Sequence, residues 1–295
     1  MPFITLPNAR LHYVRMRTNK NAARKASEEL VLLHGLAANL GFWYLQVAPA
    51  LTSSHYSVTM FDLRGHGLSS MPRSGYSPDI LAKDLQGLLD NLGIESAHLV
   101  GHSFGGCVGL HFLCQHPDRV RSLTLVDVRL RTLQPRLNLR AWASWPRYRA
   151  ALACVGVHPD EDSFDLDFRL FDQLAALALK NPEAMNRLQR LLPSPFAGRA
   201  GKAAARRWLH LLDTTTARSE LQSGERLSQG QLSLLKTETL LVYGEFSQAL
   251  PTGVALSAEW PHAHFEVAQR AGHFFPMNSP EKLLAPVEKF IGAIT

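Results

Sequence analysis

Residues 97–106 read AHLVGHSFGG, an apolar run that ends in the pattern Gly-x-Ser-x-Gly and continues into a helical pattern. A serine in a sharp strand-to-helix turn has a strained backbone, so its neighbours two positions away must be small. Gly101 and Gly105 meet this requirement. Such a turn lifts a hydroxyl above the end of a sheet, and the helix that follows presents backbone N–H groups to a developing oxyanion. We therefore predict that Ser103 is a nucleophile.

Strand and helix patterns alternate on both sides of this turn. Apolar runs typical of strands occur at residues 3–6, 11–16, 30–33, 56–61, 97–100, 120–126, 239–243 and 264–268, and helical periodicity occurs at 39–51, 78–92, 104–115, 249–259 and 281–294. Strands separated by helices predict an α/β fold with a mostly parallel central sheet. Helical segments punctuated by prolines fill the region between. We predict a core formed by residues 1–128 and 236–295, interrupted by a helical insertion at 129–235.

Composition and charge exclude several classes of protein. The chain has 295 residues, 46% hydrophobic and 19% charged, which is ordinary for a globular protein. Its three cysteines are too few for a disulfide framework and indicate free thiols in a reducing compartment. The net charge of +6 is not accompanied by a nucleic-acid-binding module. Without a signal-peptide pattern or an apolar run of about 20 residues, we expect a cytoplasmic protein with no nucleic-acid partner and no stable membrane insertion.

A serine nucleophile needs a base and a site for the oxyanion. We predict His273 as the base, because it lies in a loop after the last strand pattern. The other histidines are interpreted as solvated or core residues. Leu36 follows the early strand at 30–33, and we expect the N–H groups of Leu36 and Phe104 to form the oxyanion hole. No cysteine or histidine spacing indicates a metal site, and no glycine-rich loop followed by lysine indicates a phosphate site, so we expect no metal site and no phosphate-binding loop.

Several motifs, taken in order, resemble the α/β-hydrolase superfamily. They are His34-Gly35, the run DLRGHGLS at 62–69, the turn at 101–105, and Gly272-His273. The resemblance implies a Ser-His-acid triad, a cofactor-independent mechanism and a helical cap, formed by the insertion, that shapes the substrate pocket. A serine nucleophile argues against the dehalogenase and epoxide-hydrolase branches, which use aspartate at that position.

The acid of the triad departs from the family pattern. The resemblance implies an aspartate shortly after the strand at 239–243, commonly as Gly-x-x-Asp, whereas this chain reads Gly-Glu-Phe-Ser at 244–247. Asp127, at the end of the strand at 120–126, is our predicted acid. Glu245, next to the usual position and with a longer side chain, is the alternative, and a missing or recruited acid is a third possibility. Which residue is the acid matters for activity, because the acid holds the imidazole of the base in the reactive tautomer.

The insertion contains the residues expected to select the substrate. Residues 129–149 combine arginines with Trp142, Trp145 and Tyr148 and contain no acidic residue. This pattern has two interpretations: recognition of an anionic or carrier-linked substrate, such as a thioester of coenzyme A or of a carrier protein, or a solvated helix face whose tryptophans anchor the insertion. We favour the second. Residues 163–179 are acidic and then apolar, and predict a helix that lines the pocket.

These residues together predict a serine hydrolase. It would cleave an ester or thioester of a hydrophobic acyl group through an acyl-enzyme on Ser103. An acyltransferase or a carbon–carbon bond hydrolase would use the same triad. A ligand-binding protein on a hydrolase fold is a further alternative, supported by Ser247 at the expected acid position.

Overall fold

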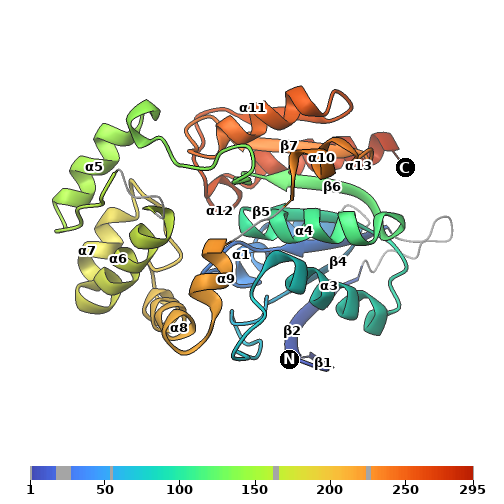
Figure 1. The fold of residues 1–295 in the computed structure, drawn as a ribbon, viewed down its shortest axis with the longest axis horizontal. Helices are drawn as coiled ribbons and strands as arrows, with labels where there is room; N and C mark the ends of the chain where they lie inside the picture. Colours follow the sequence, from blue (N-terminus) through green and yellow to red (C-terminus); the bar gives the residue numbers. More distant parts are fainter. Residues whose placement is uncertain (1, 18–27, 54–55, 162–165, 224–226, 295) are drawn as a thin grey trace.

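A central sheet of eight strands organises the molecule (Figure 1). The computed structural model describes residues 2–17, 28–53, 56–161, 166–223 and 227–294; residues 163–165 of the expected pocket helix lie outside this description. The strand order is β1-β2-β4-β3-β5-β6-β7-β8. β1 and β2 form an antiparallel hairpin, β2 is antiparallel to β4, and all other neighbours are parallel. The predicted α/β class is confirmed. The strands are β1 (Phe3–Leu6), β2 (Ala9–Met16), β3 (Glu29–Leu33), β4 (Ser57–Phe61), β5 (Ala97–His102), β6 (Val120–Val126), β7 (Thr239–Gly244) and β8 (His264–Ala268).

Helices cover both faces of the sheet. Side chains of α3 and α4 pack in a core on one face, and side chains of α1, α2 and α13 pack in a second core on the other. Along β3, Val31 and Leu33 belong to the first core and Leu30 and Leu32 to the second. Because both faces are covered, residues 30–33 of this strand are all apolar rather than alternating with polar residues. The helices are α1 (Gly41–Tyr44), α2 (Val47–Ser53), α3 (Pro78–Leu92), α4 (Phe104–Gln115), α5 (Trp145–Ala153), α6 (Leu166–Lys180), α7 (Pro182–Leu188), α8 (Gly201–Thr214), α9 (Ala217–Ser223), α10 (Gln229–Ser233), α11 (Leu250–Glu259), α12 (Phe275–Asn278) and α13 (Glu281–Ile294).

The helical pattern at 39–51 forms two short helices instead of one. α1 ends at Tyr44 and α2 begins at Val47. Pro49 explains the break, because a proline cannot donate a hydrogen bond to the carbonyl four residues earlier and its ring clashes with that carbonyl. That carbonyl belongs to Leu45, whose side chain is 77% exposed. Pro49 is tolerated in the first turn of the new helix.

The segment between β6 and β7 forms a separate group of helices. Figure 1 shows α5, α6, α7 and α8 gathered beyond one end of the sheet. Their apolar side chains form a third core, which also includes Ala37 and Tyr76 from the sheet-bearing part. We call α5–α9 the inserted helices. In the described part of this segment, no strand occurs.

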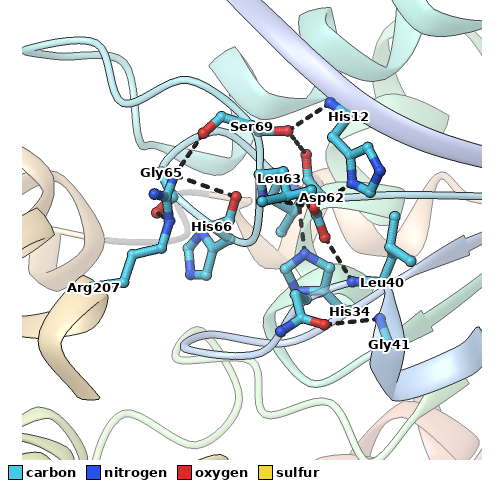
Figure 2. Close-up of polar contacts among 12 residues, drawn as sticks. His12, His34, Leu40, Gly41, Asp62, Leu63, Gly65, His66, Ser69 and Arg207 are labelled. Atoms are coloured by element: carbon cyan, nitrogen blue, oxygen red, sulfur yellow. Dashed lines mark hydrogen bonds and ion pairs between the residues drawn. The ribbon is translucent and has the colours of Figure 1, made fainter. Parts of the chain in front are cut away.

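Residues 62–69 form a loop that joins the sheet to the inserted helices (Figure 2). Asp62 is buried and accepts hydrogen bonds from the N–H groups of Leu40 (2.7 Å) and Leu68 (2.8 Å) and from Nδ1 of His12 (2.7 Å). Gly67 has a φ of +48°, and a Cβ there would lie 2.1 Å from the Asp62 carboxylate. Only glycine therefore fits where the loop turns over this carboxylate.

Arg207 connects α8 to the same loop. Its Nε donates to the carbonyl of Gly65 (3.0 Å), and its Nη2 donates to the carbonyl of Ser69 (2.5 Å). These charge-assisted hydrogen bonds fasten one inserted helix to backbone groups of the sheet-bearing part (Figure 2). The position of α8 and the position of the loop are therefore coupled.

Burial of neutral histidines predicts that acid destabilises the fold. Burial, followed by the neighbouring His34, lowers the pKa of His66 to about 3, so its imidazole stays neutral in the folded chain at pH 5. The unfolded chain binds a proton at this position below about pH 6.5. Because the unfolded state binds more protons, the free energy of unfolding falls as pH falls. The loss expected from this one residue is about 2 kcal/mol between pH 6.5 and 5.

Urea unfolding at several pH values between 7 and 5 measures this effect. His66→Asn keeps a donor for the Arg64 carbonyl, which His66 Nδ1 contacts at 3.0 Å, and should flatten the pH dependence. His210 is exposed, so His210→Gln should leave the dependence as in the parent. An equal slope in the parent and in His66→Asn would contradict the prediction.

Candidate active site

Ser103 occupies a strained turn between β5 and α4. Its φ and ψ are 52° and −124°, values that a residue with a side chain rarely adopts. A Cβ on Gly105 would lie 2.4 Å from the carbonyl oxygen of Leu33, and one on Gly101 would lie 2.5 Å from Cα of Gly106. The two glycines are needed because backbone crowds both sides of the turn. Phe104 begins α4, so its N–H has no partner within the helix.

His273 and Asp127 face each other across the ends of two strands. Asp127 follows β6, and His273 lies in the loop between β8 and α12. Nδ1 of His273 lies 3.7 Å from Oδ1 of Asp127, and the Asp127 side chain is fully buried. Oδ2 of Asp127 accepts the N–H of Gly244 at 3.2 Å. Within the described ranges, neither Oδ1 of Asp127 nor Nδ1 of His273 has a hydrogen-bond partner.

A separation of 3.7 Å is longer than a hydrogen bond. Catalytic hydrogen bonds are often long without substrate and shorten in the complex. With Nδ1 of His273 directed at a buried carboxylate, Nε2 lies on the opposite edge of the ring. This arrangement can hold an imidazole in the tautomer that accepts a proton at Nε2.

The alternative acid is engaged elsewhere. Glu245 is exposed, and its Oε2 accepts the backbone N–H of Arg270 at 2.6 Å. Ser247, which stands where the family places an aspartate, accepts the N–H of Ala249 at 3.1 Å near the start of α11. The geometry therefore favours Asp127 over Glu245 as the partner of His273.

His34 fixes the backbone that carries the N–H of Leu36, which the sequence predicts to be an oxyanion donor. The N–H of Leu63 donates to Nε2 of His34 at 3.1 Å, so the proton of this imidazole is on Nδ1 (Figure 2). Nδ1 in turn donates to the carbonyl of Gly35 at 2.8 Å. The peptide between Gly35 and Leu36 is trans, so its N–H points away from that carbonyl. Orienting the Gly35 carbonyl thus also orients the N–H of Leu36.

His102 is a further residue of the site, which no pattern in the sequence predicted. Nε2 of His102 donates to the backbone carbonyl of His273 at 2.9 Å. Its ring stacks on Phe42, with centroids 4.5 Å apart, and burial holds its pKa well below the ordinary value. A neutral His102 therefore ties the loop of His273 to the turn of Ser103. Its place immediately before the nucleophile was the only signal in the sequence.

One cavity brings these groups together. It has a volume of about 460 Å³, and its lining includes Ser103, His273 and Leu36. Asp127 lies behind His273 and Phe104 at the start of α4, and neither of them lines the cavity, nor does Glu245. The lining also has an apolar part that comes from the inserted helices, with Phe168, Phe171, Leu174 and Trp208.

The arginines of residues 129–149 divide between several environments. Arg129 and Arg147 line the cavity beside Trp142 and Tyr148. Arg131 donates to the carbonyl of Gln222 at 2.6 Å, and Arg149 lies 3.3 Å from the Glu161 carboxylate. Trp145 is buried among the inserted helices. Arg190 and Arg270, which lie outside this segment, also line the cavity.

Within the described ranges, no three or more His, Cys, Asp or Glu side chains are arranged to hold a metal ion. Among the same residues, no helix combines the length and the apolar character that crossing a bilayer requires.

Comparison with known proteins identifies the family. A 2-hydroxy-6-oxononadienedioate/2-hydroxy-6-oxononatrienedioate hydrolase of Paraburkholderia phymatum is 27% identical over 287 residues, covering 94% of this chain and 91% of the relative. A fluoroacetate dehalogenase of a Burkholderia species is 43% identical over 104 residues, a match that spans only 34% of either chain. The enol-lactonase structure from Burkholderia xenovorans, 20% identical, shares the fold with a TM-score of 0.66 and coverage of 99% of this chain and 100% of the lactonase. The family model for the alpha/beta hydrolase fold matches residues 29–280. The chain therefore belongs to the α/β-hydrolase family.

Proposed function

We propose that the protein is a serine hydrolase that cleaves an ester or thioester of a hydrophobic acyl group. The observation that supports this most is the buried Asp127 carboxylate directed at His273, whose ring lines the same cavity as Ser103. A Ser-His-acid arrangement is recognised by geometry and roles rather than by sequence position.

In the proposed mechanism, the Oγ of Ser103 attacks the carbonyl carbon while Nε2 of His273 takes the hydroxyl proton. The N–H groups of Leu36 and Phe104 stabilise the oxyanion that forms. The bond to the leaving oxygen or sulfur then breaks, and His273 returns its proton to that atom. Water, deprotonated by His273, hydrolyses the acyl-enzyme, and Asp127 remains ionised throughout.

The apolar wall supports the assignment of the acyl group. Phe168, Leu174 and Trp208 line the cavity and are almost fully buried. Each apolar methylene that leaves water for such a surface contributes about 0.8 kcal/mol. Binding should therefore strengthen with acyl length until the cavity is filled.

A carbon–carbon bond hydrolase is the second candidate. Its support is the relative from Paraburkholderia phymatum, a hydrolase whose match covers 94% of this chain. Such an enzyme would use Ser103 and His273 on a diketone, with a carbon atom as the leaving group, and would leave simple esters intact.

A substrate panel separates these functions. We expect turnover of p-nitrophenyl esters and of neutral acyl thioesters, with little cleavage of a vinylogous 1,5-diketone. Rapid quenching and intact-mass measurement should show a transient adduct of one acyl group. Cleavage of the diketone alone would favour the second candidate. If no substrate is turned over and no adduct forms, the result would favour a ligand-binding protein. If the acyl group is transferred to an added alcohol in preference to water, the protein is an acyltransferase.

His34→Ala should lower kcat with little change in KM. The substitution removes the donor that fixes the Gly35 carbonyl, so the N–H of Leu36 is no longer held toward the oxyanion. Loss of one oxyanion donor costs about 10²- to 10³-fold in kcat. Steady-state kinetics on the best ester measure the effect. His66→Asn is the control, because His66 belongs to the same network but makes no hydrogen bond to Gly35; its kcat should stay within a few-fold of the parent. A kcat of His34→Ala equal to that of the parent would contradict the role of His34 in orienting the Leu36 N–H.

A further inference from the structure

Three arginines lie at the outer edge of the cavity that contains Ser103 and His273. Arg147 belongs to α5, Arg190 follows α7, and Arg270 lies in the loop after β8. All three line the cavity, and all three are exposed to solvent. A side chain that both lines a cavity and remains exposed lies at its mouth. We call these residues the mouth arginines.

The backbone of Arg270 is held in place by Glu245. Arg270 has a φ of 55°, and its N–H donates to Oε2 of Glu245 at 2.6 Å. The carboxylate thus stabilises a left-handed backbone conformation that a side-chain-bearing residue seldom adopts. Glu245 itself is not part of the cavity lining. This gives the carboxylate a structural role and fixes where the Arg270 side chain leaves the backbone.

The charge of the cavity lining has one sign. Among the side chains that the structure describes, the lining contains arginines and no aspartate or glutamate. The guanidinium group is always charged and matches carboxylate and phosphate groups with two parallel hydrogen bonds. Three guanidinium groups around one opening attract an anion. A neutral ligand would gain no such electrostatic attraction.

The interior of the cavity, unlike its charged mouth, is apolar. Phe168, Leu174 and Trp208 are 5%, 4% and 2% exposed, respectively, and all three line the cavity. An acyl chain would enter this apolar part, which places the other side of the scissile bond toward the mouth. A substrate that fits both regions is apolar on the acyl side and negatively charged on the leaving-group side.

We propose that the mouth arginines bind a phosphate or carboxylate group carried by the leaving alcohol or thiol of the substrate. This inference rests on the proposed serine hydrolase function and specifies its substrate. When Ser103 takes the acyl group, the carbon–oxygen or carbon–sulfur bond breaks, and the leaving group receives the proton held by His273. It then departs through the mouth with its anionic group still near the arginines.

Two thioesters that differ by one phosphate test the inference. S-hexanoyl-pantetheine and S-hexanoyl-4′-phosphopantetheine have the same acyl group and the same scissile bond. We expect the phosphate to raise kcat/KM by about tenfold in the parent, since exposed ion pairs contribute up to about fivefold each. The triple variant Arg147→Gln/Arg190→Gln/Arg270→Gln should lose this advantage, so that its kcat/KM values for the two thioesters become equal. High salt should reduce the advantage in the parent.

Arg187→Gln is the matched control. Arg187 lies on α7, three residues before Arg190, and is exposed but does not line the cavity. This variant should keep the preference for the phosphorylated thioester. A third thioester, S-adipoyl-pantetheine, carries its charge on the acyl side and should be a poorer substrate than S-hexanoyl-pantetheine.

The outcomes separate the two proposals. If the parent turns over neither the hexanoyl thioesters nor a p-nitrophenyl ester and forms no acyl adduct, the proposed function fails. If it hydrolyses S-hexanoyl-pantetheine but gains nothing from the phosphate, only the inference about the mouth arginines is wrong. The same conclusion follows if the triple variant retains the preference, or if the adipoyl thioester is the better substrate.

Discussion

Ser103→Ala should lower ester turnover by about 10⁶-fold, the size of loss seen when a serine hydrolase loses its nucleophile. The alanine side chain lacks the oxygen that attacks the carbonyl, while the strained turn, with its φ of 52°, is retained. Intact-mass measurement with a fluorophosphonate gives a second readout that needs no substrate. The parent should gain one phosphonyl group per chain, and the alanine variant should gain none.

Ser247→Ala is the control for this experiment. Ser247 is buried, and its Oγ accepts the N–H of Ala249, so its loss tests whether a second serine near the site affects labelling. The variant should be labelled as fast as the parent. A parent that is folded but resists the fluorophosphonate would contradict an activated Ser103 and would favour the ligand-binding alternative.

Asp127→Asn should lower turnover by about 10⁴-fold, as loss of the corresponding charge does in a serine protease. An asparagine can still accept the N–H of Gly244, which Asp127 accepts at 3.2 Å, so the fold should be kept. Its amide no longer stabilises the imidazolium of His273 and permits the unreactive tautomer. Measuring kcat together with urea unfolding separates this effect from a loss of stability.

Glu245→Gln is the matched comparison. The glutamine keeps an oxygen for the N–H of Arg270 and removes only the charge. We expect turnover within a few-fold of the parent. A large loss in Glu245→Gln together with full activity in Asp127→Asn would reverse the assignment of the acid.

The fold could be predicted from the sequence wherever a local pattern of residues determines the structure. The apolar run at residues 30–33 indicated a strand buried on both faces, because each of these four side chains enters a core. The turn of Ser103 could be predicted because the backbone is so crowded on both sides of it that only glycine fits two positions before and after the serine. By contrast, the break between α1 and α2 depends on a proline in the first turn of a new helix, and the periodicity of apolar residues does not reveal it.

The site could be predicted only in part, because the packing of segments that are distant in the sequence brings its residues together. The choice between Asp127 and Glu245 depends on β6, β7 and β8 lying side by side, which directs one carboxylate toward His273 and the other toward Arg270. The hydrogen bond from His102 to the His273 carbonyl joins two distant segments. The separation of Arg147 from Arg149, one at the cavity and one at Glu161, likewise depends on how α5 packs.

The hydrogen bonds of Arg207 limit how this enzyme can be recombined with its relatives. Arg207 holds the loop at 62–69, whose Leu63 N–H fixes the tautomer of His34, while the next residue, Trp208, forms part of the cavity wall. Two successive residues of α8 thus hold the loop behind the proposed oxyanion hole and line the cavity. The inserted helices are therefore not an exchangeable module. A chimaera that took them from another hydrolase would change the cavity and also remove the support of the proposed oxyanion hole, unless the donor supplied an arginine at the same turn.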